Sequence, residues 1–436
     1  MTTLTDRLRS HGVVGAGGAG FPTYVKAQAT AEIVIVNAAE CEPLLHKDKE
    51  LLHHYQDHVL AGLRSLMAEV GATRGIVAIK EKYVDRIAAL EEALAAEEHL
   101  TVFALGDFYP AGDEFITIYE ATGRVVPPGG LPLDVGCVVT NVETLLNISL
   151  AAPVTHKFLT IGGHVPEPVT VRAPVGISYA EVLAAVGVDV TTLGGVLDGG
   201  VMMGKLVKDY SAVVTRTTGG LLCFPEGHGL VTRYEVEKPA RDIIAKSACD
   251  QCSFCTELCP RYLLGHPVEP HLAMRGLEFN MVGDSMILGS SFCCECNLCT
   301  LYSCPEDLFP KDACADNKVM MKLKGLEHPA KGKPSKPHSM QDYRHVPVSS
   351  LMKKLDLLRF QNVGPLVDVR WEPSEVRIPL QQHIGAPAVA RVAVGALVRV
   401  GDEIGAAPDG LGVAIHASID GTVTEVGDHI VIRRDQ

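Results

Sequence analysis

Eight cysteines in two runs, each ending in a Cys-Pro pair, constrain this chain more than any other feature. The first run has the spacing C-x2-C-x2-C-x3-C, and the second has C-x2-C-x2-C-x4-C. In chain order the cysteines are Cys249, Cys252, Cys255, Cys259, Cys293, Cys296, Cys299 and Cys304. Thiolates are soft ligands that suit iron–sulfur clusters or zinc, and the following Pro260 or Pro305 breaks a helix that would run through the loop. The spacing therefore predicts two loops that wrap inorganic centres.

Each run resembles the bacterial ferredoxin signature of a 4Fe–4S cluster, in which the fourth cysteine of a run binds the cluster of the other run. By that rule one cluster is held by Cys249, Cys252, Cys255 and Cys304, and the second by Cys259, Cys293, Cys296 and Cys299. Zinc and disulfides are the alternatives, but a zinc site usually shows two separated C-x2-C pairs. Two clusters in tandem predict a path for single electrons.

The second run is less regular than the first, because it has four residues before its last cysteine and carries Cys294 beside Cys293. We expect Cys293 to be the ligand, since it keeps the x2 spacing, and Cys294 to be a buried neighbour. The cysteines outside the runs have no C-x2-C partner and are expected to be small buried thiols. They are Cys41, Cys137, Cys223 and Cys314.

Composition narrows the class of protein. The 436 residues predict two to four domains, and the net charge of −13 argues against a nucleic-acid partner. Cysteines spaced for clusters indicate a reducing, cytoplasmic setting. The first 20 residues lack a secretory signal pattern. The most apolar stretch, at 135–152, is broken by polar residues, so we expect no membrane span.

The first 150 residues alternate short apolar runs with helical patterns. Strands are predicted at 33–36, 76–79 and 102–105, and helices at 51–70 and 83–96. This alternation predicts a parallel sheet with helices on both faces. In such sheets ligands bind at the carboxyl ends of the strands.

The rest of the chain divides by composition. Residues 165–225 predict a small β-rich unit with one helix, which begins at a capping box of Ser178 and Glu181. Residues 327–350 are rich in proline and lysine and predict a linker, followed by a short helix at 351–360. The last 60 residues predict a small β-barrel or sandwich.

A glycine-rich segment, 15–23, is the second informative motif, because glycine lets backbone N–H groups approach a phosphate or a flat ring closely. It precedes the first predicted strand, unlike a Rossmann fingerprint, which follows one. Polar groups at 37–43 follow that strand, and Asn141 and Thr144 offer an amide and a hydroxyl later. A bound flavin or nucleotide is the favoured interpretation, with a structural loop as the alternative. A flavin would also couple a two-electron donor to one-electron clusters.

Several segments resemble known families. GAGGAGFPTYVK and VNAAECEPLLHKDKELL are similar to the NADH-binding flavoprotein subunit of respiratory complex I, and more so to the C subunit of Rnf-type complexes. TNVETLLNI resembles the same family's later flavin segment, and PVTVRAPVGISYAEVLAAVG resembles its ubiquitin-like SLBB domain. The last 60 residues resemble the Rnf barrel-sandwich segment, which here comes last. That order looks like the cobalamin reductases of propanediol-utilisation microcompartments.

The resemblance implies an oxidoreductase that binds FMN and two 4Fe–4S clusters and uses NADH to reduce cobalamin for an adenosyltransferase, with no side chain as a classical acid or base. It implies a dinucleotide and flavin pocket shaped by Gly15, Gly17, Gly18, Gly20 and Phe21. It also implies Lys26 near the FMN phosphate, an acidic strand end of Asn37, Glu40 and Glu42, and a later contact at Asn141. Position 39 is Ala where complex I has Asp, which puts one flavin contact in doubt.

The expected fold is multidomain α/β. A Rossmann-like FMN and NADH domain is expected at 1–160, a β-grasp SLBB domain at 161–228, a ferredoxin-like two-cluster domain at 229–325, a linker at 326–350 and a barrel-sandwich hybrid at 351–436. The hairpin at 415–421 lacks the lysine that lipoyl domains modify, so docking or support is expected of the barrel. His416 is expected to be an ordinary histidine rather than a ligand to a corrin cobalt.

The expected setting is the interior of a bacterial microcompartment, with a shell protein as a further partner. One alternative function is an electron-transfer subunit of an Rnf-type or another microcompartment complex, with ferredoxin or a quinone as partner. The other is a scaffold whose clusters are structural.

Overall fold

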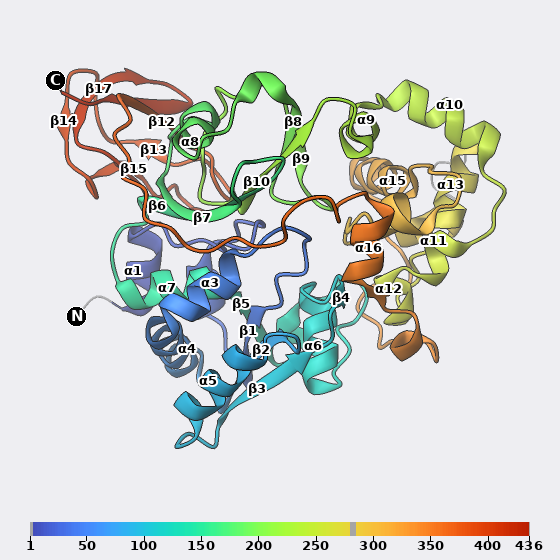
Figure 1. The fold of residues 1–436 in the computed structure, drawn as a ribbon. Coiled ribbons are helices and arrows are strands. Elements are labelled where there is room, and N and C mark those ends of the chain that lie inside the picture. Colours follow the sequence, from blue (N-terminus) through green and yellow to red (C-terminus); the bar gives the residue numbers. More distant parts are fainter. Residues whose placement is uncertain (1–2, 280–284, 436) are drawn as a thin grey trace.

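The computed structural model describes residues 3–279 and 285–435. It shows a sheet-containing N-terminal unit, a second sheet beside it, a helical cysteine-rich segment and a C-terminal barrel at the opposite side of the molecule from that segment (Figure 1). Among the described helices, none combines the length and apolar character needed to cross a membrane.

The N-terminal unit is built on a parallel sheet of order β3-β2-β1-β5. Its strands are β1 (Ile33–Ala38), β2 (Arg74–Lys80), β3 (Leu100–Leu105) and β5 (Cys137–Asn141). The central β1 is apolar along most of its length, so its alternate side chains enter two separate cores. One core is covered by α3 (Lys47–His54), α4 (Gln56–Val70), α5 (Val84–Leu94) and α7 (Val142–Leu150), and the other by α6 (Glu114–Thr122). The predicted parallel sheet with helices on both faces is confirmed.

The short helices α1 (Leu4–Ser10) and α2 (Thr23–Ala27) precede β1 and flank the glycine-rich segment. Both contribute buried residues to the core on the α4 side of the sheet. The glycine segment is therefore fixed at both ends to the body of the unit.

The second unit has a five-stranded mixed sheet of order β7-β6-β10-β8-β9. The strands are β6 (His156–Gly163), β7 (Val169–Pro174), β8 (Leu193–Asp198), β9 (Lys205–Val207) and β10 (Gly220–Pro225). One helix, α8 (Tyr179–Ala185), packs on it, and the predicted capping box of Ser178 and Glu181 starts that helix. The expected boundary between 160 and 161 falls within β6, because this strand begins at His156 and pairs with β7 from its first residue.

The cysteine-rich segment is helical in its described residues. Its helices are α9 (Gly229–Glu235), α10 (Lys238–Ala248), α11 (Phe254–Glu257), α12 (Pro260–Leu263), α13 (Pro270–Phe279), α14 (Ser285–Leu288) and α15 (Pro310–Lys324), with helical turns η3 (Gly289–Phe292) and η4 (Cys299–Ser303). Pro260 begins α12, because the first helical position needs no N–H donor and proline has none.

The segment after the cysteines differs from the expectation. Strand β11 (Val346–Pro347) pairs with β4 (Phe108–Tyr109), and the helix that follows is α16 (Val348–Lys354) rather than 351–360. Leu351 and Met352 pack in a core shared with Tyr109 and Cys296. The boundary expected at 351 therefore lies inside α16, whose apolar face packs in a core shared by the N-terminal, second and cysteine-rich units. Helical spacing shows an apolar face but not which unit will cover it.

From α16 the chain crosses the molecule between the first two sheets to reach the barrel (Figure 1). On the way, the Leu366 N–H donates to Glu50 at 3.0 Å, and Thr170 bridges to Leu366. The crossing segment thus ties the C-terminal unit to α3 of the N-terminal unit and to β7 of the second unit.

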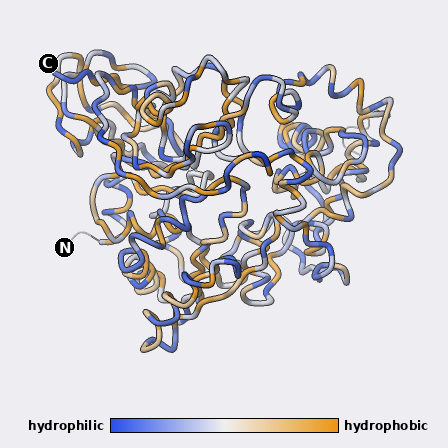
Figure 2. Tube along the Cα trace, viewed as in Figure 1, coloured by the Kyte–Doolittle hydropathy of each residue, from blue (hydrophilic) through white to orange (hydrophobic). Residues whose placement is uncertain are grey.

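The C-terminal unit consists of two small sheets, β12-β18-β17-β14 and β13-β15-β16, around one apolar core. The strands are β12 (Glu375–Pro379), β13 (Val389–Ala390), β14 (Leu397–Val398), β15 (Glu403–Ala406), β16 (Ile415–His416), β17 (Gly421–Val426) and β18 (His429–Arg433). Hydrophobic and hydrophilic stretches alternate along the trace here as in the other units (Figure 2). The predicted small β-barrel or sandwich is confirmed.

Candidate functional site

The glycine-rich segment forms a closed loop. The Gly15 N–H donates to the Phe21 carbonyl at 2.8 Å, and the Gly20 N–H to the Gly15 carbonyl at 3.2 Å. Gly18 has a φ of +112°, and a Cβ on it would meet no atom of the described residues within 4 Å. The loop therefore presents bare backbone to an open side, which is the kind of surface that accepts a phosphate or a flat ring.

Two polar residues at the start of α7, Asn141 and Thr144, contact this loop. The Ala16 N–H donates to the Thr144 hydroxyl at 3.0 Å, and a Cβ on Gly17 would lie 3.5 Å from the Asn141 side chain. Asn141 also caps α7 by accepting from the Glu143 N–H. The structure thus brings Asn141 and Thr144 to the glycine loop, although more than 120 residues separate them in the sequence.

Asn37 lies at the carboxyl end of β1 and contacts a segment that the sequence motifs did not single out. Its amide donates to the Gly112 carbonyl at 2.7 Å, and the Gly112 N–H approaches the Cys41 sulfur at 3.4 Å. The segment Gly112-Asp113-Glu114 follows β3 and β4 and leads into α6, which begins at Glu114. Its signal was present in the sequence: polar residues after a predicted strand of a parallel sheet.

Glu40 points to the N-terminus of α3. Its carboxylate accepts from the Asp48 N–H at 3.0 and 3.1 Å and from the Lys49 N–H at 3.2 Å. Burial raises the pKa of Glu40 to about 7, and the nearby Asp48 adds to the rise. The helix N-terminus, which favours a negative charge, works against that rise.

Four buried charged side chains form a network between the glycine loop and α3 that sequence reasoning missed. Lys47 contacts Asp48 at 2.6 Å and Glu143 at 3.1 Å, Lys157 pairs with Glu143, and Asn141 donates to Asp48 at 2.7 Å. Lys157 also donates to the Ala16 carbonyl at 3.1 Å. Burial works to raise the pKa of Glu143, but Lys157 and Lys47 outweigh it and hold that pKa below its usual value.

Lys26 and Glu42 are engaged elsewhere. Lys26 contacts Glu114 at 3.0 Å and the Val139 carbonyl at 2.7 Å. Glu42 accepts from the Met202 and Met203 N–H groups at 2.9 Å each, so it ties the N-terminal unit to the second one. Burial raises the pKa of Glu42 to about 7.

These residues fit a flavin. The open side of Gly18 gives a flat ring room that a side chain would fill. The charged network beneath the loop, whose charges are paired with one another, holds the loop in place. Aspartate is absent at position 39, where Ala39 is fully buried.

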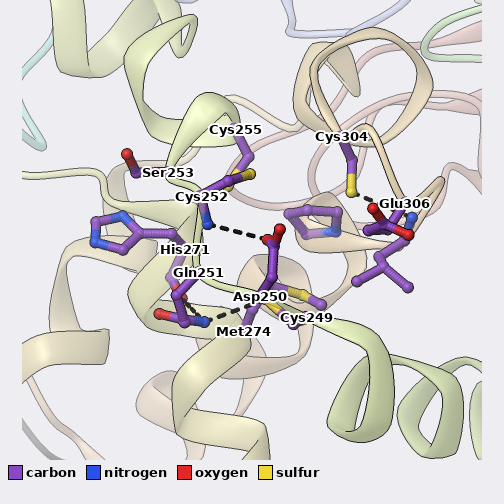
Figure 3. Close-up of a pocket in the computed structure, with 12 residues that line it drawn as sticks. Cys249, Asp250, Gln251, Cys252, Ser253, Cys255, His271, Met274, Cys304 and Glu306 are labelled. Carbon is purple, nitrogen blue, oxygen red and sulfur yellow. Dashed lines mark hydrogen bonds between the residues drawn. The ribbon is translucent and has the colours of Figure 1, made fainter.

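Four cysteines of the first predicted group line one pocket (Figure 3). Cys249 follows α10, Cys252 and Cys255 come from the loop and α11, and Cys304 arrives from the second run. Cys252 is exposed, whereas Cys255 and Cys304 are buried. The structure therefore brings the last cysteine of the second run to the first run, as the crossed pairing expects.

The second predicted group gathers around Cys259. Burial raises the pKa of Cys259, as do Cys294 and Cys293 nearby, and burial raises that of Cys299 with Cys293 and Cys259 close to it. In the described residues, no three His, Cys, Asp or Glu side chains converge closely enough to hold a single metal ion. A cubane binds one thiolate at each of four irons, so its ligands stand further apart than those of one ion.

The two cysteine runs share a backbone conformation. Gln251 and Ser253 have positive φ in the first run, as do Glu295 and Asn297 in the second. These residues stand two and four positions after Cys249 and Cys293, respectively. The same left-handed turns support Cys293, rather than Cys294, as the start of the second loop.

The other thiols are placed as follows. Cys294 is half-buried beside Cys296, and Cys314 is buried beside Cys293. Cys137 and Cys223 are buried, and Cys41 is half-buried. The proximity of Cys314 to the second group had no signal in its sequence position, since α15 brings it there.

The histidine at the barrel hairpin is an internal residue. His416 is buried, and burial lowers its pKa to about 3, with Arg216 contributing to the decrease. It cannot reach a ligand outside the barrel without a rearrangement, which agrees with the expectation of an ordinary histidine.

Comparison with known proteins places these features. Residues 8–150 match the family model of the Nuo51 FMN-binding domain, residues 248–309 that of a 4Fe-4S dicluster domain, and residues 365–436 that of the RnfC barrel sandwich hybrid domain. The fold and the site thus define a flavin-binding protein with two iron–sulfur clusters, whose N-terminal unit is related to the Nuo51 FMN-binding domain.

The full-length relatives are more specific. The chain is 42% identical over 434 residues to "Cobalamin reductase PduS" of Salmonella typhimurium, covering 98% of this chain and 95% of the relative. It is 40% identical over 435 residues to the protein of that name in Citrobacter freundii, covering 98% and 96%. The chain belongs to the PduS cobalamin reductase family.

A more distant relative shares part of the chain. It is the C subunit of the Na(+)-translocating ferredoxin:NAD(+) oxidoreductase complex of Acetobacterium woodii, which is 33% identical over 261 residues. The match covers 58% of this chain and 56% of that relative.

Proposed function

We propose that this protein is a cobalamin reductase that uses NADH as electron donor, FMN and two 4Fe–4S clusters as internal carriers, and cobalamin as acceptor. One observation carries the proposal: the identity to the PduS reductases runs through 98% of the chain and is not confined to the cofactor-binding segments. When bound, FMN couples a two-electron hydride donor to single-electron carriers, and the clusters conduct single electrons.

In this proposal the chain positions the carriers and excludes water, and no side chain acts as a general acid or base. Backbone of the glycine loop, Asn37, Asn141 and Thr144 would hold the flavin. The buried network around Glu143 would fix the loop beneath it, because its charges are paired and enclosed. Glu40 and Glu42 would act indirectly, through α3 and the second unit.

The cluster ligands proposed are those of the crossed pairing. Cys249, Cys252, Cys255 and Cys304 would hold one cluster, and Cys259, Cys293, Cys296 and Cys299 the other. We assign FMN and NADH to the N-terminal unit, an SLBB domain to the second unit, the clusters to the helical segment, and docking or support to the barrel.

The setting follows from the same relationship. We propose cobalamin, free or presented by an adenosyltransferase, as the partner at the acceptor end. A microcompartment interior, with contact to a shell protein, is the proposed location. Co-purification of the protein with shell proteins from the native host tests the location.

The activity is tested with anaerobically reconstituted protein. NADH and cob(III)alamin are supplied, and the absorption spectrum is followed for cob(II)alamin. We expect NADH-dependent corrin reduction that is lost in Cys304→Ser and retained in Ser247→Ala, a change on the exposed surface of α10. Oxidation of NADH with an artificial dye but no corrin reduction would overturn the assignment of the acceptor.

A second function is favoured by the relationship to the Acetobacterium woodii relative and by the RnfC-type barrel that this chain possesses. In that case the protein would be an electron-transfer subunit with ferredoxin or a quinone as partner. Co-fractionation with integral membrane subunits, together with ferredoxin reduction and no corrin reduction, would favour it.

A further inference from the structure

Arg261 is a buried cation next to the second cysteine group. It follows Cys259 and Pro260 on α12, and its side chain is 9% exposed. Its Nη2 contacts the Asp113 carboxylate at 2.8 Å, and its guanidinium lies over the Phe115 ring, 3.7 Å from the centroid. Both partners belong to the N-terminal unit, so Arg261 joins that unit to the cysteine loop.

Two other donors of Arg261 are left without a partner in the described part of the chain. Its Nε and Nη1 are buried and have no hydrogen-bond partner among the residues that the structure describes. Burial works to lower the pKa of Arg261, but Asp113 and then Cys294 and Cys296 outweigh it and raise that pKa, so these thiols lie beside the guanidinium. Buried N–H groups are nearly always satisfied. A cluster at this loop would supply the missing acceptors, because its sulfur atoms accept hydrogen bonds.

The junction around Arg261 is buried and is held by further hydrogen bonds. The Tyr109 hydroxyl, also buried, donates to the Cys296 carbonyl at 2.7 Å. Asp113 caps α6 by accepting from the Phe115 and Ile116 N–H groups. The guanidinium thus has a fixed position, and the low local dielectric strengthens its field.

The two cysteine groups differ in this respect. At the first group the side-chain donor to sulfur is neutral: the Gln251 amide, 3.2 Å from Cys249, and Cys252 there is exposed. Net charge, hydrogen bonds to sulfur and solvent exposure set the reduction potential of a cluster.

We propose that Arg261 is a positioning residue that raises the reduction potential of the cluster held by Cys259, Cys293, Cys296 and Cys299. This inference rests on the cluster assignment proposed above. A positive charge and N–H donors at sulfur both favour the reduced cluster, which carries one more negative charge. Asp113 limits the effect by partly neutralising the guanidinium.

Redox titrations followed by electron paramagnetic resonance test the proposal on the full chain with both clusters loaded. Arg261→Gln should shift the midpoint potential of one cluster signal downward and leave the other in place. Asp113→Asn should shift the same signal upward. Opposite shifts distinguish charge tuning from loosened packing, because either substitution would disturb the same contact. Cys304→Ser should remove the first cluster and so identify the second cluster's signal.

Arg241 provides a matched control. It pairs with Asp312 and lies near the Phe309 ring, as Arg261 does with Asp113 and Phe115. Arg241→Gln should leave the second cluster's signal unshifted.

Three results would overturn the inference: no shift in Arg261→Gln, an equal shift of both signals, or shifts of the same sign in the Arg261 and Asp113 variants. If the Arg261→Gln protein loses iron, the Arg261→Lys variant is titrated in its place. In that case an unshifted signal in both Arg261→Lys and Asp113→Asn overturns the inference. Wild-type protein that never shows two cluster signals would instead contradict the proposed function.

Discussion

At the scale of single residues, burial decides which polar side chains remain available for chemistry. Glu40 and Glu42 stand two positions apart in one segment, yet Glu40 caps α3 and Glu42 binds the loop at Met202. Each carboxylate is taken up by backbone N–H groups that need an acceptor. Their proximity in sequence therefore does not make them one acidic site.

Glu42 should make stability depend on pH. Its pKa in the folded protein is about 7, above its ordinary value of 4.5, because of burial. A raised carboxyl pKa means that the folded state holds the proton more tightly than the unfolded state does. The stability that the protonated Glu42 gives is therefore fully present below pH 4.5 and is lost as the pH rises through 7. The loss is about 3 kcal/mol. In thermal unfolding, Glu42→Gln should gain stability relative to wild type between pH 5 and 8. An unchanged difference across that range would contradict the raised pKa.

The crossed pairing of the cysteines gives a second residue-level prediction. Cys304→Ser should lose the cluster encircled by the first run, and Cys259→Ser that of the second, because each contributes its thiolate to the opposite loop. Iron content and the two cluster signals in electron paramagnetic resonance are the measurements. Cys223→Ser, a buried thiol in the second sheet, is the control and should keep both clusters. If each variant loses the cluster of its own run, the pairing is uncrossed.

At the scale of elements, the helix α3 shows how the site depends on a cap from outside the helix. Its N-cap residue, His46, makes no side-chain capping bond, and Glu40 supplies the acceptor from the end of β1. The cap fixes Lys47 and Asp48, which lead to Asn141 and Glu143. The position of α3 therefore determines the polar floor of the glycine loop.

Glu40→Ala should lower the free energy of unfolding by about 1 kcal/mol through loss of the cap and should weaken FMN retention. Ser178→Ala removes a comparable cap from α8 and is the matched control. We expect a similar loss of stability there with FMN retained. Thermal unfolding and the fluorescence of released flavin measure the two effects. Equal flavin loss in both variants would show that the cap of α3 has no special part in the site.

At the scale of the whole molecule, the glycine loop is also the place where three units meet. The Ile384 N–H of the barrel unit donates to the Gly20 carbonyl at 3.1 Å, and a Cβ on Gly20 would lie 2.8 Å from Thr217 and 3.3 Å from His383. Docking of the barrel and the shape of the loop are therefore coupled.

Gly20→Ala should cost more stability than its positive φ alone would explain, because the new Cβ would press on this junction. Gly71 is the control, because its φ of +70° is close to the +65° of Gly20 but a Cβ there would meet nothing within 4 Å. We expect Gly71→Ala to cost about 1 kcal/mol, and Gly20→Ala to cost more and to release FMN faster. Thermal unfolding and flavin fluorescence give the comparison. Equal losses of stability in Gly20→Ala and Gly71→Ala would mean that the neighbouring units move away from the new Cβ at no cost.

Local signals in the sequence predicted a large part of this picture. The cysteine spacing indicated the two-cluster segment, because a loop around a cube needs ligands at fixed intervals. Apolar runs between helical patterns predicted the parallel sheet, and the quoted motifs indicated the family. Boundaries were less accurate: β6 begins at His156, and α16 belongs to a shared core.

The sequence by itself determined the kinds of centre that this protein is built to hold, since spacing and local backbone preference are properties of neighbouring residues. The tertiary structure alone decided which distant side chains surround them. Arg261 meets Asp113 across 148 positions, and Lys157 meets the Ala16 carbonyl across 141. Such pairs leave no pattern in the local sequence, because the partner of a buried charge is a residue that only the fold brings next to it.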